Sequence, residues 1–216
     1  MIFLIENFSQ LLMRVWEHLF MSMTALMLGV LFAVPLGLVI SRNKRLSNTI
    51  IAISSVLQTI PSLALLAMMV PIFGVGRFPA IIALFIYSLL PILRNTVLGM
   101  NSVNKDVVDA AKGMGLTNRQ LIFKVQVPLS VSVIMAGIRL SAIYVVAWTS
   151  LASYIGAGGL GDFIFNGLAN YDFKYIIMGT VPITLLALII DGLLGMLEER
   201  LTPKFKRSIV SEGELA

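Results

Sequence analysis

Residues 109–115 read Asp-Ala-Ala-Lys-Gly-Met-Gly and belong to the longest polar interval between two apolar segments of the chain. The interval predicts two short helices. The first begins near Asn104 and ends at the glycines, and the second opens at Thr117, which with Gln120 has the form of a capping box. Pro128 then marks a break or a new helix start. Two interpretations are open: a helix whose small side chains let another protein approach, or a solvated loop between two membrane helices.

The spacing within this interval resembles the EAA loop of permease subunits of bacterial ABC importers. An acidic residue precedes Ala-Ala, a glycine follows after three residues, and Val-x-Val-Pro follows after nine more. Asp109 stands where glutamate is usual, and Val125 and Val127 stand where isoleucine and leucine are usual. In that family the loop is the coupling helix, which sits in a cleft of the cytoplasmic ATP-hydrolysing subunit. The resemblance implies these coupling residues: Asp109, Ala110, Ala111, Lys112, Gly113, Met114, Gly115 and Pro128. Within that set we expect Ala110, Ala111 and Gly115 to be small because the partner closes over them.

The composition is that of an integral membrane protein. Of the 216 residues, 58% are apolar and 12% are charged, against about a quarter charged in ordinary soluble domains. The net charge of +5 does not indicate nucleic acid, because the basic residues lie in the gaps between apolar runs. The chain has no cysteine, so it has neither a disulfide nor a thiolate metal site. His18 is the only histidine, and a lone histidine makes no metal site.

Apolar runs predict an all-α fold of one transmembrane domain, residues 18–198. We expect five spans, at about 19–40, 49–75, 78–99, 128–154 and 175–197. Residues 1–17 are expected to form a short amphipathic lead-in segment, interfacial in character, with the charged side chains opposite an apolar face. Residues 199–216 form a polar tail. Gly29, Ala33 and Gly37 make a small-residue stripe suited to close helix packing.

The distribution of lysine and arginine predicts the orientation. Most of the basic residues lie in the gap after the first span, the gap after the third span, and the tail. The positive-inside rule therefore places the central polar interval and the C-terminus in the cytoplasm, and an odd number of spans then places the N-terminus outside.

Polar side chains within the spans are candidates for lining a transport route: Gln58, Thr59, Ser62, Tyr87, Asn95, Tyr144 and Trp148. The alternative for those near Pro61 is that they satisfy backbone groups freed by the proline, and the alternative for the aromatic residues is packing. A buried charge needs a partner, so we expect Asp191 to pair with Arg139 or with Arg94, although Arg94 lies near the interface.

Residues 156–161, Gly-Ala-Gly-Gly-Leu-Gly, match the G-x-G-x-x-G dinucleotide fingerprint. That fingerprint requires a preceding strand in a βαβ unit, and here an apolar span precedes it. We therefore expect a glycine-rich loop between spans. A short amphipathic helix is expected within residues 162–174, acting as a gate or an interfacial segment.

Beyond the central interval, nearly the whole chain resembles the permease subunit of osmoprotectant importers, the quaternary-amine branch of the type I ABC importers. The stretches that carry this resemblance are 57–64, 79–84, 87–96, 113–115, 136–139 and 155–161. It implies the five-helix core of methionine-importer-like permeases in a bacterial cell membrane. The implied cargo is glycine betaine, carnitine, choline or a related compatible solute. Aromatic faces hold a quaternary ammonium by cation–π attraction, although in the family that cage belongs to the binding protein.

The resemblance also implies partners: two ATP-binding subunits, a second permease subunit, identical or related, and a separate extracytoplasmic substrate-binding protein. ATP and Mg would sit on the ATP-binding subunits, and this chain would bind no cofactor and be no enzyme. It lacks the G-x-x-x-x-G-K-[ST] phosphate loop as well as hydrolase motifs. The alternatives are an importer for another small solute, such as an amino acid, and a secondary transporter, which would need an internal repeat and an acidic relay.

Overall fold

The computed structural model describes residues 7–202, and every regular element in that range is a helix. The α-helices are α2 (Phe8–Ile40), α3 (Lys44–Thr59), α4 (Ser62–Phe73), α5 (Arg77–Asn101), α6 (Lys105–Gly113), α7 (Asn118–Gln120), α8 (Val127–Thr149), α9 (Gly161–Ala169) and α10 (Phe173–Leu201). A π-helical segment (Leu121–Gln126) precedes α8, and a 3₁₀ segment (Ser150–Ile155) follows it. The predicted all-α class is confirmed.

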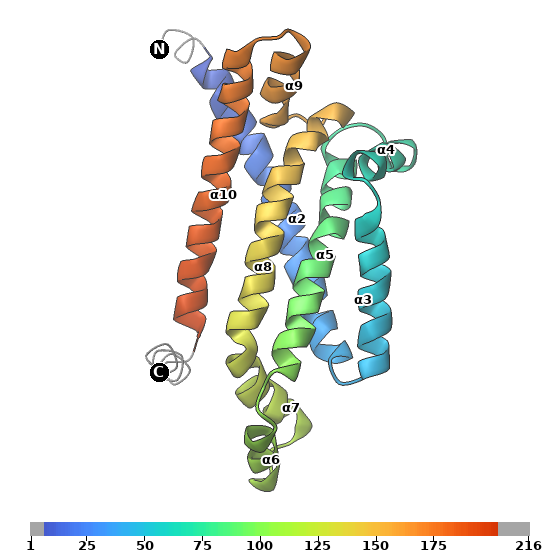
Figure 1. Ribbon diagram of the computed structural model, residues 1–216, viewed down its shortest axis with the longest axis vertical. Helices are drawn as coiled ribbons and strands as arrows, with labels where there is room; N and C mark the ends of the chain where they lie inside the picture. Colours follow the sequence, from blue (N-terminus) through green and yellow to red (C-terminus); the bar gives the residue numbers. More distant parts are fainter. Residues whose placement is uncertain (1–6, 203–216) are drawn as a thin grey trace.

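The long helices α2, α5, α8 and α10 run lengthwise beside α3, and the short helices lie at the two ends (Figure 1). The helices α4 and α9 lie at the end where α2 begins, and α6 and α7 project beyond the opposite end (Figure 1). The chain therefore leaves α2, α5 and α10 at the same end, where the basic residues of the first and third gaps lie together with Arg200 of the last turn of α10. The side of the membrane that this end faces remains a prediction.

The small-residue stripe of α2 packs against α5, as predicted. A Cβ atom added to Gly29 would lie 2.0 Å from Ser88 Oγ, and one added to Gly37 would lie 2.7 Å from Thr96 Cβ. These contacts exclude any larger side chain without movement of α5. Because small residues let helix backbones approach closely, this stripe allows α2 and α5 to pack over much of their length.

The expected second span, 49–75, is not one straight helix. It consists of α3 and α4, which meet at a bend of 92°. Ile60 is extended (φ −62°, ψ 127°), as a residue before proline prefers, and Pro61 lacks the N–H that would continue the helix. Within the described residues, four helices are long and apolar enough to cross a membrane, and the bent pair makes a fifth crossing if it counts as one.

The expected lead-in segment is also corrected, since residues 8–17 are the first turns of α2 rather than a separate element. Residues 1–6 and 203–216, which include most of the expected tail, lie outside the described residues. The polar face of these turns is buried: Glu17 and His18 lie inside the bundle, whereas Met13 and Trp16 are exposed. The charged side chains point inward because their partners lie on other helices, as described below.

Candidate functional site

The helices α6 and α7 form a small hairpin, and their ends are capped as the sequence predicts. Asn104 Oδ1 accepts a hydrogen bond from the backbone N–H of Asp106 (2.8 Å). The Lys112 ammonium lies 3.0 Å from an Asp109 carboxylate oxygen, although both side chains are exposed. The capping box of Thr117 and Gln120 is present and confirmed. Exposed pairs of this kind contribute only a few tenths of a kcal/mol, so the caps define the shape of the hairpin more than its stability.

The C-terminal end of α6 is a Schellman motif with Gly115 in the left-handed conformation (φ 81°). The N–H of Gly115 donates to the Lys112 carbonyl (2.9 Å), and the N–H of Leu116 donates to the Ala111 carbonyl (3.3 Å). Ala111 is only 2% exposed, so its small size is set by packing within the chain. The expectation that a partner closes over Ala111 is therefore wrong, whereas Ala110 and Gly115 are exposed.

The exposed side of α6 carries an apolar stripe made of Val107, Ala110 and Met114. These residues are three and four positions apart and so lie on one face of a helix. Met114 is 74% exposed, Val107 is also exposed, and a Cβ atom added to Gly113 or Gly115 would meet nothing within 4 Å. The hairpin thus presents an open, apolar, sterically unobstructed face at the end of the bundle.

The hairpin is joined to α8 through the π-helical segment 121–126. A π-helical turn is uncommon and is frequent at functional positions. Leu121 of this segment is buried, whereas Phe123 is exposed. Pro128 lies at the start of α8 but inside a continuous helical segment, so its missing N–H leaves one backbone carbonyl of the preceding turn without that donor. The chain nevertheless stays helical from Asn118 to Ile155, which connects the hairpin directly to a membrane-spanning helix.

An ion-pair clamp joins α8 to α10 through Arg139, Asp191 and Glu198. Arg139 Nε and Nη2 donate to the two carboxylate oxygens of Asp191 (2.8 and 2.9 Å), and Nη1 donates to Glu198 Oε2 (3.0 Å). Gly195 lies between these acids on α10, and a Cβ atom there would be 3.5 Å from the guanidinium carbon. Arg94 is exposed. Of the two arginines expected opposite Asp191, Arg139 is thus the one in contact.

Three of the candidate route residues form an aromatic cluster next to the bend between α3 and α4. The ring of Trp148 is stacked on Tyr144 at 5.3 Å and lies 4.5 Å from Tyr87. The Tyr87 hydroxyl donates to the Ile60 carbonyl (2.6 Å), a group that the helix break leaves without its usual partner. Tyr87 is buried, but Tyr144 is 38% exposed, so the cluster reaches the surface of the chain on α8.

The remaining candidate route residues divide into two groups. Gln58, Thr59 and Ser62 flank the bend, and the Thr59 hydroxyl donates to a carbonyl of its own helix. Asn95 lies on α5, two turns beyond Tyr87, where its amide donates to the Pro91 carbonyl (2.9 Å) and packs against Gly137. The structure therefore places Asn95 apart from the aromatic cluster.

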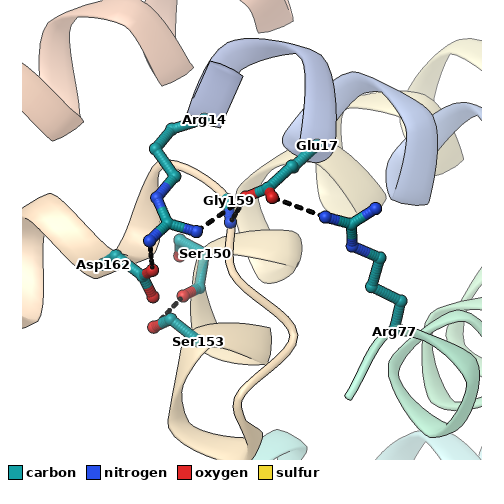
Figure 2. A network of polar contacts seen from close by, with 7 residues as sticks. All are labelled: Arg14, Glu17, Arg77, Ser150, Ser153, Gly159 and Asp162. Atoms are coloured by element: carbon teal, nitrogen blue, oxygen red, sulfur yellow. Dashed lines mark hydrogen bonds and ion pairs between the residues drawn. The ribbon is translucent and has the colours of Figure 1, made fainter. Parts of the chain in front are cut away.

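A second charge cluster lies at the opposite end of the bundle from α6 and was not expected from the sequence (Figure 2). The Glu17 carboxylate accepts hydrogen bonds from Arg14 (2.8 Å), from Arg77, and from the backbone N–H of Gly159 (3.0 Å). Arg14 also contacts Asp162 (2.8 Å). Burial raises the pKa of the Asp162 carboxyl, Arg14 opposes that rise, and the charge of Glu17 adds to it. The cluster joins α2, the start of α5, the glycine-rich loop and α9.

This cluster explains the glycine-rich sequence 156–161, which is a loop between spans, as expected. Gly158 and Gly159 both have φ near +80°. A Cβ atom on Gly158 would lie 2.6 Å from Glu17 Oε2 and 2.8 Å from Arg14 Nη1. The glycines thus serve close packing of the loop on α2. Neighbouring His18 is fully buried and its Nε2 lies 2.9 Å from the Val146 carbonyl, which ties α2 to α8.

Sequence reasoning missed Val107, Glu198 and the Glu17 cluster. Val107 was detectable as the first member of a helical stripe with Ala110 and Met114. Glu198 lies seven residues after Asp191, on the same helix face, but one residue beyond the expected end of the fifth span at 197. The Glu17 cluster joins residues up to 148 positions apart, Arg14 and Asp162, so no local pattern indicates it.

Comparison with known proteins assigns a family to the chain. Residues 11–203 match the model of the binding-protein-dependent transport system inner membrane component. The chain is 56% identical to the carnitine transport permease protein OpuCB of Listeria monocytogenes over 97% of this chain and 96% of that protein. It is 52% identical to the choline transport system permease protein OpuBB of Bacillus subtilis over 93% of each. It is 37% identical to the osmoprotectant import permease protein OsmW of Salmonella typhimurium, over 94% of this chain and 96% of that protein.

Solved structures share the fold. A chain of the MetNI methionine ABC transporter in inward-facing conformations superimposes with a TM-score of 0.81, covering 92% of this chain and 99% of that one at 24% identity. An amino acid ABC transporter superimposes with a TM-score of 0.76 at 18% identity, over 92% of this chain and 97% of that one. The expected methionine-importer-like permease fold is confirmed.

Proposed function

Because the chain belongs to the family of binding-protein-dependent transport system inner membrane components and is the permease subunit of an ABC importer, we propose that it carries compatible solutes with a quaternary amine. The observation that carries this proposal is the identity of 50% or more with permeases named for carnitine, choline and glycine betaine. The alternative cargo is another small solute such as an amino acid. The methionine transporter shares the fold at 24% identity, which does not by itself favour that cargo.

We further propose that the α6–α7 hairpin is the coupling element. Its exposed stripe of Val107, Ala110 and Met114 supplies an apolar surface, and Gly113 and Gly115 leave the backbone beside it open. An amphipathic helix of this kind fits a groove in a partner protein. The partner is the cytoplasmic ATP-binding subunit, present in two copies and holding ATP and Mg. The direct helical connection to α8 gives a path for its movement into the membrane.

In this proposal the transport route passes the aromatic cluster. A quaternary ammonium has no hydrogen-bond donor, and aromatic faces attract it by cation–π interaction. Trp148 and Tyr144 offer such faces at an exposed surface of α8, where a second permease subunit would complete the route. A separate extracytoplasmic binding protein would deliver the solute to the end of the bundle that carries α4 and α9.

The test is uptake into right-side-out membrane vesicles that contain the permease and its ATP-binding subunit, with the binding protein on the outside. Labelled choline, carnitine and glycine betaine are each compared with methionine, with ATP enclosed in the vesicles. ATP-dependent uptake of at least one quaternary amine, without uptake of methionine, is expected. Uptake of methionine alone would support the alternative cargo. Uptake driven by a proton gradient without ATP would contradict the importer mechanism.

A further inference from the structure

A hollow lies between the last turns of α2 and the π-helical segment that follows the α6–α7 hairpin. Its volume is about 420 Å³, and it is lined by Pro35, Leu38, Val39, Arg42, Ile122 and Phe123. All but Arg42 are apolar, and Val39 and Phe123 are well exposed. The site thus combines an open apolar wall with one cationic side chain at its edge.

The hollow lies at one end of an apolar face of α2, and this face is about as long as a lipid acyl chain. A second apolar hollow of about 360 Å³ is lined by Leu28, Leu31, Phe32 and Phe85. Positions 28, 31, 35, 38 and 42 repeat at three and four residues, so they lie on one face of α2. The rise from Leu28 to Arg42 is about 21 Å. That is enough to cover the roughly 15 Å of one hydrocarbon leaflet and to place Arg42 at the headgroups.

Charge at this edge is uncompensated by protein. Within the part of the chain that the structure describes, the Arg42 guanidinium donates one long hydrogen bond, from Nη2 to the Asn118 carbonyl (3.3 Å). Among residues 7–202, no carboxylate lies within ion-pair distance of Arg42, and the sequence has no acidic residue between Glu17 and Asp106. Lys44 and Arg45 follow in the same gap and are exposed. A planar guanidinium with spare donors matches the geometry of a phosphate.

We propose that an anionic phospholipid occupies this site. Its phosphate binds the unpaired Arg42 guanidinium, and one acyl chain fills the hollow beside Val39 and Phe123. A zwitterionic lipid also offers a phosphate, but its own cation would be held close to Arg42, whereas Lys44 and Arg45 add only to the general positive charge of this gap. The geometry therefore selects anionic over zwitterionic lipid.

The bound lipid touches the element that we assign to coupling. Arg42 contacts Asn118, the first residue of α7, and Ile122 and Phe123 form the far wall of the hollow. Lipid in the hollow therefore bridges the end of α2 to the segment between the hairpin and α8. The link to coupling rests on the proposed function, whereas the lipid site itself does not.

The test purifies the intact importer from vesicles of phosphatidylcholine alone or mixed with phosphatidylglycerol and measures the lipids that remain bound by native mass spectrometry. Arg42→Gln should lower the preference for phosphatidylglycerol about fivefold, the effect of roughly one basic side chain near a membrane surface. Arg45→Gln removes the same charge from the same gap but does not line the hollow, so it should have a smaller effect. Arg42→Lys should keep most of the preference.

The apolar wall is tested with Val39→Trp, which fills the hollow, against Leu188→Trp, a similarly exposed position on α10. Loss of bound lipid with Val39→Trp alone supports the site. Equal effects of Arg42→Gln and Arg45→Gln would show that the lipid preference comes from general surface charge, and the proposed site would be wrong. If Val39→Trp instead releases the second permease subunit and leaves the lipid preference unchanged, protein rather than lipid covers this face, and the proposal is wrong. Lipid retention is measured without transport, so a failed uptake assay leaves this result readable.

Discussion

Arg139 and Asp191 form a two-pronged ion pair between α8 and α10, with Nε and Nη2 of the arginine 2.8 and 2.9 Å from the two carboxylate oxygens. The helix α10 is mostly exposed, and Glu198 adds a further ion pair from Arg139 to the same helix (3.0 Å). The pair is placed in the middle of α8, where a lone arginine costs roughly 2.5–3.5 kcal/mol.

Asp191→Ala should therefore lower the amount of folded permease, and the double change Asp191→Ala with Arg139→Leu should restore part of it. The measurement is permease abundance in membranes together with the midpoint of thermal unfolding in detergent. Arg94→Leu, an exposed arginine of α5, should neither destabilise the chain to the same degree nor rescue Asp191→Ala. Strict additivity of the Arg139 and Asp191 changes would argue against a stabilising pair.

A second prediction concerns the glycine-rich loop and uses two glycines of nearly equal φ. Gly158→Ala should destabilise the protein more than Gly115→Ala, although the two residues have φ of 82° and 81°. A positive φ costs a residue with a side chain roughly 1 kcal/mol. Only at 158 would the new Cβ also meet the Glu17 carboxylate, at 2.6 Å. Thermal unfolding of the purified variants measures the difference, and equal midpoints would show that the loop moves away from α2 at no cost.

Sequence reasoning was sufficient where the determining contacts are local or periodic. The capping box at Thr117, the end of α6 at its glycines and the small stripe of α2 all follow from spacing along one helix. The apolar runs likewise predict the crossings, since length and composition alone decide whether a helix can span hydrocarbon.

Proline shows where sequence reasoning stops. Pro35, Pro91 and Pro182 lie inside continuous helices, whereas the helix breaks at Pro61. Each proline removes one backbone hydrogen bond, so the local cost is similar. At the break before Pro61, the Ile60 carbonyl has no helical partner and instead accepts a hydrogen bond from the Tyr87 hydroxyl, 27 residues away. The inward-facing charges of α2 are likewise determined by residues far away in the sequence, because partners of Glu17 lie on α5 and in the loop at Gly159.

A third prediction follows for that bend. Tyr87→Phe removes the hydroxyl that meets the Ile60 carbonyl but keeps the ring against Trp148. An unsatisfied carbonyl costs about 1–3 kcal/mol when fully buried, and the Ile60 carbonyl is partly buried, so the midpoint of thermal unfolding should fall by a part of that amount. Tyr144→Phe is the matched control, since the same atom is lost from an exposed ring of the same cluster. Protease cleavage near residues 59–62 should increase in Tyr87→Phe alone, and equal behaviour of the two variants would exclude a role for the hydroxyl at the bend.

The last prediction tests the coupling hairpin by separating bulk from backbone strain. Gly113 lies within α6 and Gly115 has φ of 81°, yet a side chain at either would meet nothing within 4 Å of this chain. Gly113→Leu therefore adds bulk to the exposed face without strain, and Gly115→Ala adds strain with little bulk. If a partner surface closes over this face, Gly113→Leu should leave permease abundance normal but reduce recovery of the ATP-binding subunit or uncouple ATP hydrolysis from uptake. Met114→Ser, which removes apolar contact from the stripe, should act in the same direction. Abundance, co-purified ATP-binding subunit and vesicle uptake are measured on one preparation. A Gly113→Leu importer with all three at normal levels would remove α6 as the docking face, whatever Gly115→Ala does to the fold.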